Sequence, residues 1–266
     1  MNIIIIGLNA YRESLRRKTL IAFLLFAMLL IGSSTFLTVL SPGEEVKMVK
    51  NVCLSCISFF GMLIAVFAAG ALIPAEMDNR TIHTILSKPL RRITYLIGKY
   101  FGAQLTILLN IVLMSLLFLL ILFLQSRRYI DEEGGSSFAI TALITSKAML
   151  LVYFELLILS ALAFAVSTLS TSATLPVIIG IFIYIVGHSV NYLKNLSEHA
   201  ASEFMSFVIR QFYLILPNFS NFYLRNQLVH NDPYVPQGIT KLLVYALLYA
   251  GFGMLIAYIL FRKKDM

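Results

Sequence analysis

Glu155 and His188 are ionisable residues that lie inside long apolar stretches of the chain. A charge in an apolar medium is costly, so such residues usually face protein or water, where they bind an ion, relay a proton or bond across helices. At about 1.5 Å per helical residue, Glu155 lies roughly 10 Å inside the outer end of its predicted membrane span. Since His188 lies at a similar depth in the next span, the sequence predicts that the two side chains can pair, either in a substrate or proton pathway or as a structural hydrogen bond.

Cys53 and Cys56 form a C-x-x-C pair, with Met48 nearby. Sulfur ligands of this kind suit soft metals such as Cu(I), and on a helix the two cysteines share one face. Two small residues that pack between helices are the alternative, which the apolar surroundings favour. Two cysteines do not indicate a disulfide framework.

The chain lacks the signatures of nucleotide hydrolysis and of zinc proteases. A P-loop reads GxxxxGK[ST], whereas Gly98-Lys99 is followed by Tyr100 and has Ile93 at the position of the first glycine. The histidines are too scattered for an HExxH motif: His83, His188, His199 and His230. The sequence therefore predicts a protein that is not an enzyme and binds no cofactor or metal itself.

Composition places the chain in a membrane. Of its 266 residues, 59% are hydrophobic and 13% are charged, whereas soluble domains carry roughly 25% charged residues. Six segments are long enough for a hydrocarbon core, which needs about 20 apolar residues, and backbone hydrogen bonding requires them to be helices. The predicted fold is all-α, with spans at approximately 19–40, 51–75, 100–126, 148–169, 173–193 and 240–261.

Lysine and arginine placement predicts that both termini are cytoplasmic. With the N-terminus inside, the cytoplasmic segments hold 12 of the 21 basic residues and only four of the 13 acidic residues. This asymmetry follows the positive-inside rule, and the excess fits anionic lipid better than nucleic acid.

Two segments outside the spans carry further predictions. Residues 2–18 have Ile4, Leu8, Tyr11 and Leu15 at helical spacing, which predicts an interfacial amphipathic helix. The outer segment 194–239 contains the aromatic-rich stretch 204–236, which is too short and interrupted to span the membrane. It predicts either helices that enter the outer leaflet and return or a helix on the membrane surface.

The cytoplasmic segment 76–100 is long for a linker and is patterned as if it folds. Ile82, Ile85 and Leu86 form one apolar stripe, which predicts a short helix over 79–87. Asp78 or Asn79 can cap this helix, and Pro89 ends it. A second helix, with Ile93, Leu96, Ile97 and Tyr100 on its apolar side, is predicted to continue into the third span. The basic edge of the segment is Arg80, Lys88, Arg91, Arg92 and Lys99.

This segment is either a loop whose charges only fix topology or a rigid element that docks a cytoplasmic partner, and its caps favour docking. Its sequence resembles the cytoplasmic segment of ABC-2 type transporter permeases, through Glu76, Thr81, Leu86, Pro89, Arg91 or Arg92, and Gly98-Lys99. The phrase TILSKPLRRITYLIGKYFG is especially similar to the subgroup linked to multicopper-enzyme (nitrous oxide reductase) maturation. Many relatives have Gly-Thr where this chain has Arg80-Thr81.

The resemblance implies a single transmembrane domain over 1–266, with an interfacial helix at 1–18, a coupling segment at 76–99 and external re-entrant helices within 194–239. It implies that the coupling segment seats in a cytoplasmic ABC ATPase, which binds ATP and magnesium, and that two permease copies pair through spans two and five to export a substrate across the cytoplasmic membrane. A periplasmic partner is a further expectation. The expected ATPase-docking residues are Glu76, Asp78, Arg80, Thr81, His83, Leu86, Lys88, Pro89, Arg91, Arg92 and Lys99.

Two other functions fit the sequence. One is an ion-coupled secondary transporter that uses Glu155, and the other is a non-transporting assembly factor for a copper or redox enzyme. No convergent set of polar groups indicates a substrate. Gly98 and Gly102 form a G-x-x-x-G pattern that permits close helix packing.

Overall fold

The fold is an all-α bundle of long helices, as the sequence predicts. In this computed structural model the described residues are 3–37, 45–78, 92–129, 138–190, 192, 216–222 and 239–262. Their elements are α1 (Ile3–Leu15), α2 (Lys18–Leu37), α3 (Glu45–Gly70), α4 (Leu72–Asp78), α6 (Arg92–Tyr129), α7 (Phe138–Leu169), α8 (Thr174–His188), the 3₁₀ helix η2 (Phe219–Phe222) and α12 (Ile239–Arg262).

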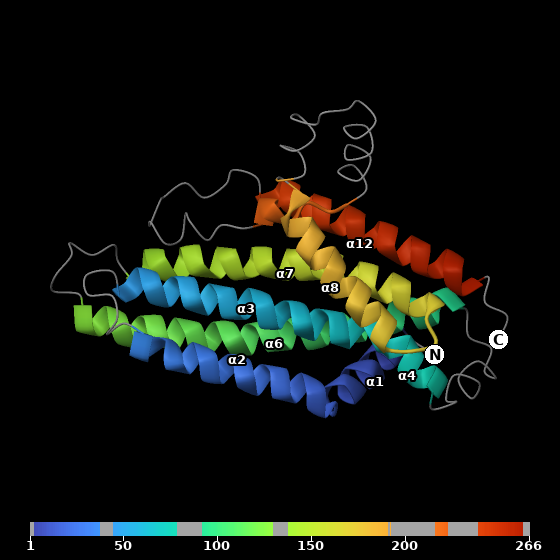
Figure 1. Cartoon of the computed structure of the whole chain (residues 1–266), viewed down its shortest axis with the longest axis horizontal. Helices are drawn as coiled ribbons and strands as arrows, with labels where there is room; N and C mark the ends of the chain where they lie inside the picture. Colours follow the sequence, from blue (N-terminus) through green and yellow to red (C-terminus); the bar gives the residue numbers. More distant parts are fainter. Residues whose placement is uncertain are drawn as a thin grey trace.

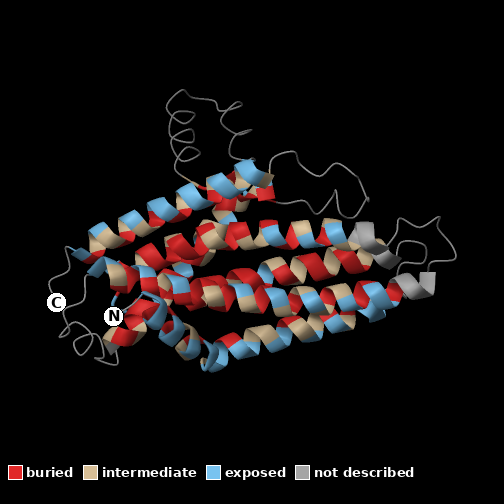
Figure 2. Cartoon of the chain, turned by 180° about the vertical axis from the view of Figure 1, so that it is seen from behind, coloured by how far each residue is buried: buried red, intermediate tan, exposed pale blue. Residues whose placement is uncertain are grey.

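The helices α3, α6 and α7 run lengthwise side by side, with α2 along one edge and α12 along the other (Figure 1). Helix α8 crosses obliquely and contacts both α3 and α7. Of the five long helices, α3 and α7 are the most buried, whereas α2 and α12 are mostly exposed. Exposed residues follow the outward faces of the outer helices (Figure 2), and many of them are large and apolar, as expected for faces that contact lipid.

Five described helices are long and apolar enough to cross a membrane. They match five of the six predicted spans. The fifth predicted span, 173–193, contains a helix of only 15 residues, α8. It ends at His188, where the backbone N–H of Ser189 bonds to the carbonyl groups of Ile185 and Val186.

Several predicted spans were shorter than the helices that contain them. Helix α3 begins at Glu45, so residues 45–50 of the expected outer loop are helical. Helix α6 continues to Tyr129, and α7 begins at Phe138, ten residues before the predicted span. The helices extend past the apolar runs because a membrane helix needs apolar side chains only within the hydrocarbon.

A close backbone contact joins α1 to α6. Gly98 and Gly102 of α6 face Gly7 and neighbouring residues of α1, and a Cβ atom added at Gly102 would lie 2.5 Å from the Gly7 carbonyl oxygen and 2.6 Å from the Ala10 Cβ. The prediction of close packing at the G-x-x-x-G pattern is confirmed, and its partner is α1. The face of α1 that packs is small and includes Gly7 and Ala10, while Ile4 and other large apolar residues are exposed.

Replacing Gly102 with alanine is expected to displace α1 from α6, because the added methyl group meets backbone and Cβ atoms rather than the flexible end of a side chain. Overpacking of this kind costs about 1–3 kcal/mol, which should lower the apparent unfolding temperature of the purified chain. Gly251→Ala is the matched control, since its added Cβ meets nothing within 4 Å. Equal unfolding temperatures for the two variants would contradict the proposed packing.

Candidate functional site

The bend between α3 and α4 positions the first residue of the candidate site. Proline has no N–H and clashes with the preceding helical turn, so Pro74 cannot continue the hydrogen bonding of α3 and is accommodated in the first turn of α4. The chain turns at Ala71, whose carbonyl accepts from the N–H of Ala75. This short helix directs Glu76 toward α6, where Tyr95 and Lys99 lie.

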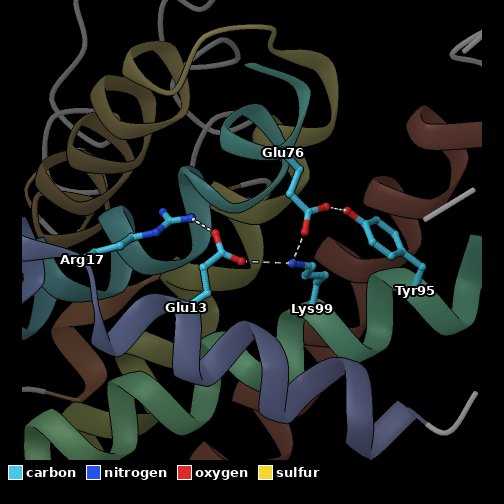
Figure 3. Close-up of polar contacts among 5 residues, drawn as sticks. All are labelled: Glu13, Arg17, Glu76, Tyr95 and Lys99. Atoms are coloured by element: carbon cyan, nitrogen blue, oxygen red, sulfur yellow. Dashed lines mark hydrogen bonds and ion pairs between the residues drawn. The ribbon is translucent and has the colours of Figure 1, made fainter. Parts of the chain in front are cut away.

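A chain of charged and polar side chains links α1, α4 and α6 (Figure 3). The ammonium of Lys99 pairs with Glu76 of α4, and the Tyr95 O–H donates to the other oxygen of the same carboxylate. Lys99 Nζ also lies 3.4 Å from Glu13 Oε2 of α1. Glu13 in turn accepts from Arg17, with 3.0 Å between Oε1 and Nη2. We call these five residues the inner charge network.

The network is buried at its centre and exposed at its edge. Glu76 and Lys99 are buried, whereas the side chain of Glu13 is 42% exposed. A buried pair is costly to break because the remaining charge keeps its desolvation penalty. The contact between Lys99 and Glu76 therefore holds α4 to α6, and the outer contact to Glu13 adds α1.

Glu13 keeps its charge at neutral pH. Partial burial raises the pKa of Glu13, but the nearby Lys99 ammonium and the Arg17 guanidinium lower it more, so the net pKa lies below the ordinary value. A carboxyl group with a lowered pKa stabilises the fold above its unfolded pKa and loses that contribution as the pH falls through the folded pKa. The contact between α1 and α6 should therefore weaken only in acid.

Two contacts attach α12 to the same end of the bundle. The Arg92 guanidinium donates from Nη1 to the carbonyl oxygens of Phe261 and Arg262, at 3.3 and 3.1 Å. A cation at a helix C-terminus is favourable because it meets unpaired carbonyl groups and the negative end of the helix dipole. The Tyr95 ring also stacks on Phe261, with centroids 5.9 Å apart. The start of α6 is thus bonded to α1, α4 and α12.

The expected docking residues divide into three groups. Glu76 and Lys99 are buried in the inner charge network rather than presented on a surface, and Arg92 caps α12. Asp78 ends α4. The others lie outside the described residues, as does the predicted helix 79–87: Arg80, Thr81, His83, Leu86, Lys88, Pro89 and Arg91. The predicted second helix of this segment is present, because α6 runs without a break from Arg92 to Tyr129.

Sequence reasoning did not include Glu13, Arg17 and Tyr95 in the site. Glu13 and Arg17 are four residues apart, the spacing at which opposite charges pair on a helix, so that pair was detectable. The contact of Tyr95 with Glu76 depends on the bend at Pro74 and on the packing of α4 against the bundle. No local pattern predicts it.

Glu155 and His188 come together, as the sequence suggests. His188 Nε2 lies 3.5 Å from Glu155 Oε1, and the carboxylate is buried near the middle of the candidate span Ala142–Leu169. Two hydrogen bonds join α7, the helix that carries Glu155, to α6. Gln104 donates to Ser160 at 2.6 Å, and Tyr100 donates to the carbonyl oxygen of Leu157 at 3.0 Å.

The cysteines are packed inside the bundle. Cys53 is buried and its Sγ lies 3.3 Å from Ser34 Oγ, while Cys56 is half-buried. Within the part of the chain that the structure describes, no three histidine, cysteine, aspartate or glutamate side chains gather as a metal site would require. The contact with Ser34 fits the interpretation that these residues pack between helices.

The long apolar helices define the class: a multi-pass helical membrane protein. Residues 14–266 match the family described as ABC-2 family transporter protein. The match covers nearly the whole chain, so the chain belongs to this family and is a permease subunit of an ABC transporter. A comparison with curated proteins found no match.

Proposed function

We propose that this permease couples ATP hydrolysis by a separate cytoplasmic ABC ATPase to the export of a substrate across the cytoplasmic membrane. Permeases of this family generally pair with such an ATPase, and the family match over residues 14–266 carries the proposal. ATP and magnesium bind to the ATPase, and both termini of the permease face the cytoplasm. The similarity of residues 84–102 to permeases of multicopper-enzyme maturation stays a prediction about the cargo.

The convergence of helices at one end supports this function. Residues 79–91, which carry most of the expected docking residues, connect Asp78 of α4 to Arg92 of α6. Both flanking helices are fixed by the inner charge network, and α6 also contacts α12 through Arg92. A force applied between Asp78 and Arg92 therefore reaches four helices directly.

We propose that Glu76 and Lys99 act in transmission rather than in docking. Their side chains bond to each other inside the chain, so an ATPase could contact them only after the pair separates. The basic residues of the segment 79–91 would contact the ATPase, and the buried pair would keep α4 and α6 moving together. Coupling of this kind would let a movement of the segment 79–91 displace both helices together.

We propose that two permease copies pair, and α8 offers a surface for the second copy. Ile178, Phe182 and Ile185 lie on one face of this helix at helical spacing and are exposed. This helix corresponds to the fifth predicted span, and it packs on α3, the second span, within one chain. The same face also fits lipid, so the stoichiometry of the complex is the relevant measurement.

Purification of the tagged permease from its own cells tests the proposed function. We expect it to retain an ATPase that contains a P-loop, with two copies of each subunit in the complex and ATP hydrolysis that the permease alone does not show. Ion-driven uptake by the permease alone, lost in Glu155→Gln, would instead favour the secondary transporter. A retained partner with no movement of any substrate would favour the assembly factor.

A further inference from the structure

The pair of Glu155 and His188 is not part of the inner charge network and is not explained by it. The Glu155 Oε1 atom is buried and has no hydrogen-bond partner among the described residues. Among the described residues, His188 is the basic side chain that lies within 4 Å of this carboxylate. An ionised carboxylate with a buried oxygen that lacks a hydrogen bond is costly in a membrane interior, so the site favours a proton.

The contact of the other ring nitrogen of His188, Nδ1, indicates which tautomer the neutral imidazole adopts and therefore what Nε2 presents to Glu155. Nδ1 lies 3.3 Å from the carbonyl oxygen of Tyr184, which can only accept a hydrogen bond. An Nδ1–H donor leaves the lone pair of a neutral imidazole on Nε2, facing Glu155. A lone pair opposite a carboxylate is repulsive. One added proton turns this contact into a hydrogen bond, either from a carboxylic acid to Nε2 or from an imidazolium to the carboxylate.

The same histidine supports η2. The hydroxyl group of Ser220 donates to the backbone carbonyl oxygen of His188 at 3.0 Å, and the Phe219 ring lies 5.8 Å from the imidazole. Phe219 also fills the space beside Gly187, where a Cβ would clash with its ring. The 3₁₀ helix η2 therefore packs on the end of α8, where His188 also faces Glu155 of α7.

We propose that Glu155 and His188 bind one proton between them, and that this proton keeps η2 seated on the end of α8. Binding adds one positive charge to a neutral imidazole and a carboxylate, and it forms one N–H···O or O–H···N bond. Loss of the proton leaves the repulsive contact and loosens the end of α8. The pair thus makes η2 responsive to pH on the side of the membrane where we place residues 194–239.

Other titratable groups lie on the elements packed around the pair, and two of them are held in contacts of their own. Titratable groups on α7, on α8 and on the elements packed around them include Lys50, Cys53 and Cys56 of α3, Tyr100 of α6, Lys147 and Tyr153 of α7, Tyr184 of α8, and Tyr245 and Tyr249 of α12. The Tyr184 hydroxyl bonds to Ser58 at 2.8 Å, and the Tyr245 hydroxyl accepts from the Asn218 N–H at 2.9 Å. Histidine is the side chain that ordinarily titrates near neutral pH.

Cysteine labelling in lipid nanodiscs tests the proposal. The chain would carry Cys53→Ala and Cys56→Ala, with Ser220→Cys as the probe and the exposed neighbour Asn221→Cys as the reference. Because both probes share the pH dependence of thiol reactivity, the ratio of their maleimide labelling rates reports the seating of η2. We expect this ratio to rise about tenfold between about pH 5 and pH 9, the range in which histidine and buried carboxyl groups titrate.

Two variants of the pair should each abolish this pH dependence. Glu155→Gln should keep the ratio low throughout, because a glutamine N–H can donate to Nε2 as the bound proton would. His188→Gln should give a labelling ratio that does not change with pH. This variant tests the proposal by itself if Glu155→Gln does not insert into the membrane. Tyr184→Phe should retain the rise, since it removes the hydroxyl contact with Ser58 and keeps the backbone carbonyl that faces His188 Nδ1. A constant ratio in the parent chain, or the same rise in either variant of the pair, would overturn the proposal.

Discussion

Replacing Lys99 with methionine is expected to destabilise the permease strongly. The substitution leaves the buried Glu76 carboxylate without its ammonium partner and also removes the contact to Glu13. Removing one member of a buried ion pair costs about 3–5 kcal/mol. Thermal unfolding of the purified chain in nanodiscs should show a large decrease in unfolding temperature, with α1 and α4 the first helices exposed to proteolysis.

A second substitution separates the charge effect from lost packing. Glu76→Gln combined with Lys99→Met removes both charges and keeps an amide oxygen that can accept from Tyr95. The double variant should recover most of the lost stability, as expected when neighbours share one interaction. Lys18→Met, which removes an exposed lysine at the start of α2, should have little effect. An unfolding temperature for Lys99→Met equal to that of Lys18→Met would contradict the buried pair.

Replacing Arg91 with glutamate is expected to release the ATPase without unfolding the permease. Arg91 belongs to the segment 79–91 that we propose as the docking element, and reversal of a charge at an interface replaces attraction with repulsion that costs several kcal/mol. A cost of about 4 kcal/mol lowers affinity roughly a thousandfold. Affinity purification should then recover the permease alone, with its unfolding temperature unchanged.

Arg12→Glu is the matched control for this change. Arg12 is an exposed arginine on α1, outside the proposed docking segment but at the same end of the bundle. This variant should retain the ATPase. Retention of the ATPase by Arg91→Glu, or its equal loss from both variants, would argue against docking through residues 79–91.

The spans were predictable because they depend on local composition. An apolar run of sufficient length in a chain of this hydropathy must be a helix if it crosses a membrane. The same criterion missed residues 45–50, 127–129 and 138–147, where helices continue with polar and charged residues either throughout or among apolar ones. It also gave no reason for α8 to end at His188, since this end depends on Ser189 and on the packing of Phe219.

The candidate site was predictable in location but not in roles. The run of basic residues between two spans located the proposed docking segment, and the burial of two ionisable groups suggested the pair of Glu155 and His188. Glu76 and Lys99 looked like surface residues because they flank a basic segment. Their contact depends on the bend at Pro74 and on α1, whose Glu13 lies 86 residues from Lys99 in sequence, so the sequence pattern alone could not predict it.

Photo-crosslinking tests the central claim most directly, because it shows where the ATPase lies on the permease. A photoreactive amino acid would replace Leu86, inside the proposed docking segment, or Phe36, an exposed residue at the opposite end of α2. Irradiation of cells that also produce the ATPase should give a covalent permease–ATPase product from position 86 and none from position 36. Crosslinking from position 36, or its absence from position 86 in a complex that still contains the ATPase, would contradict the account.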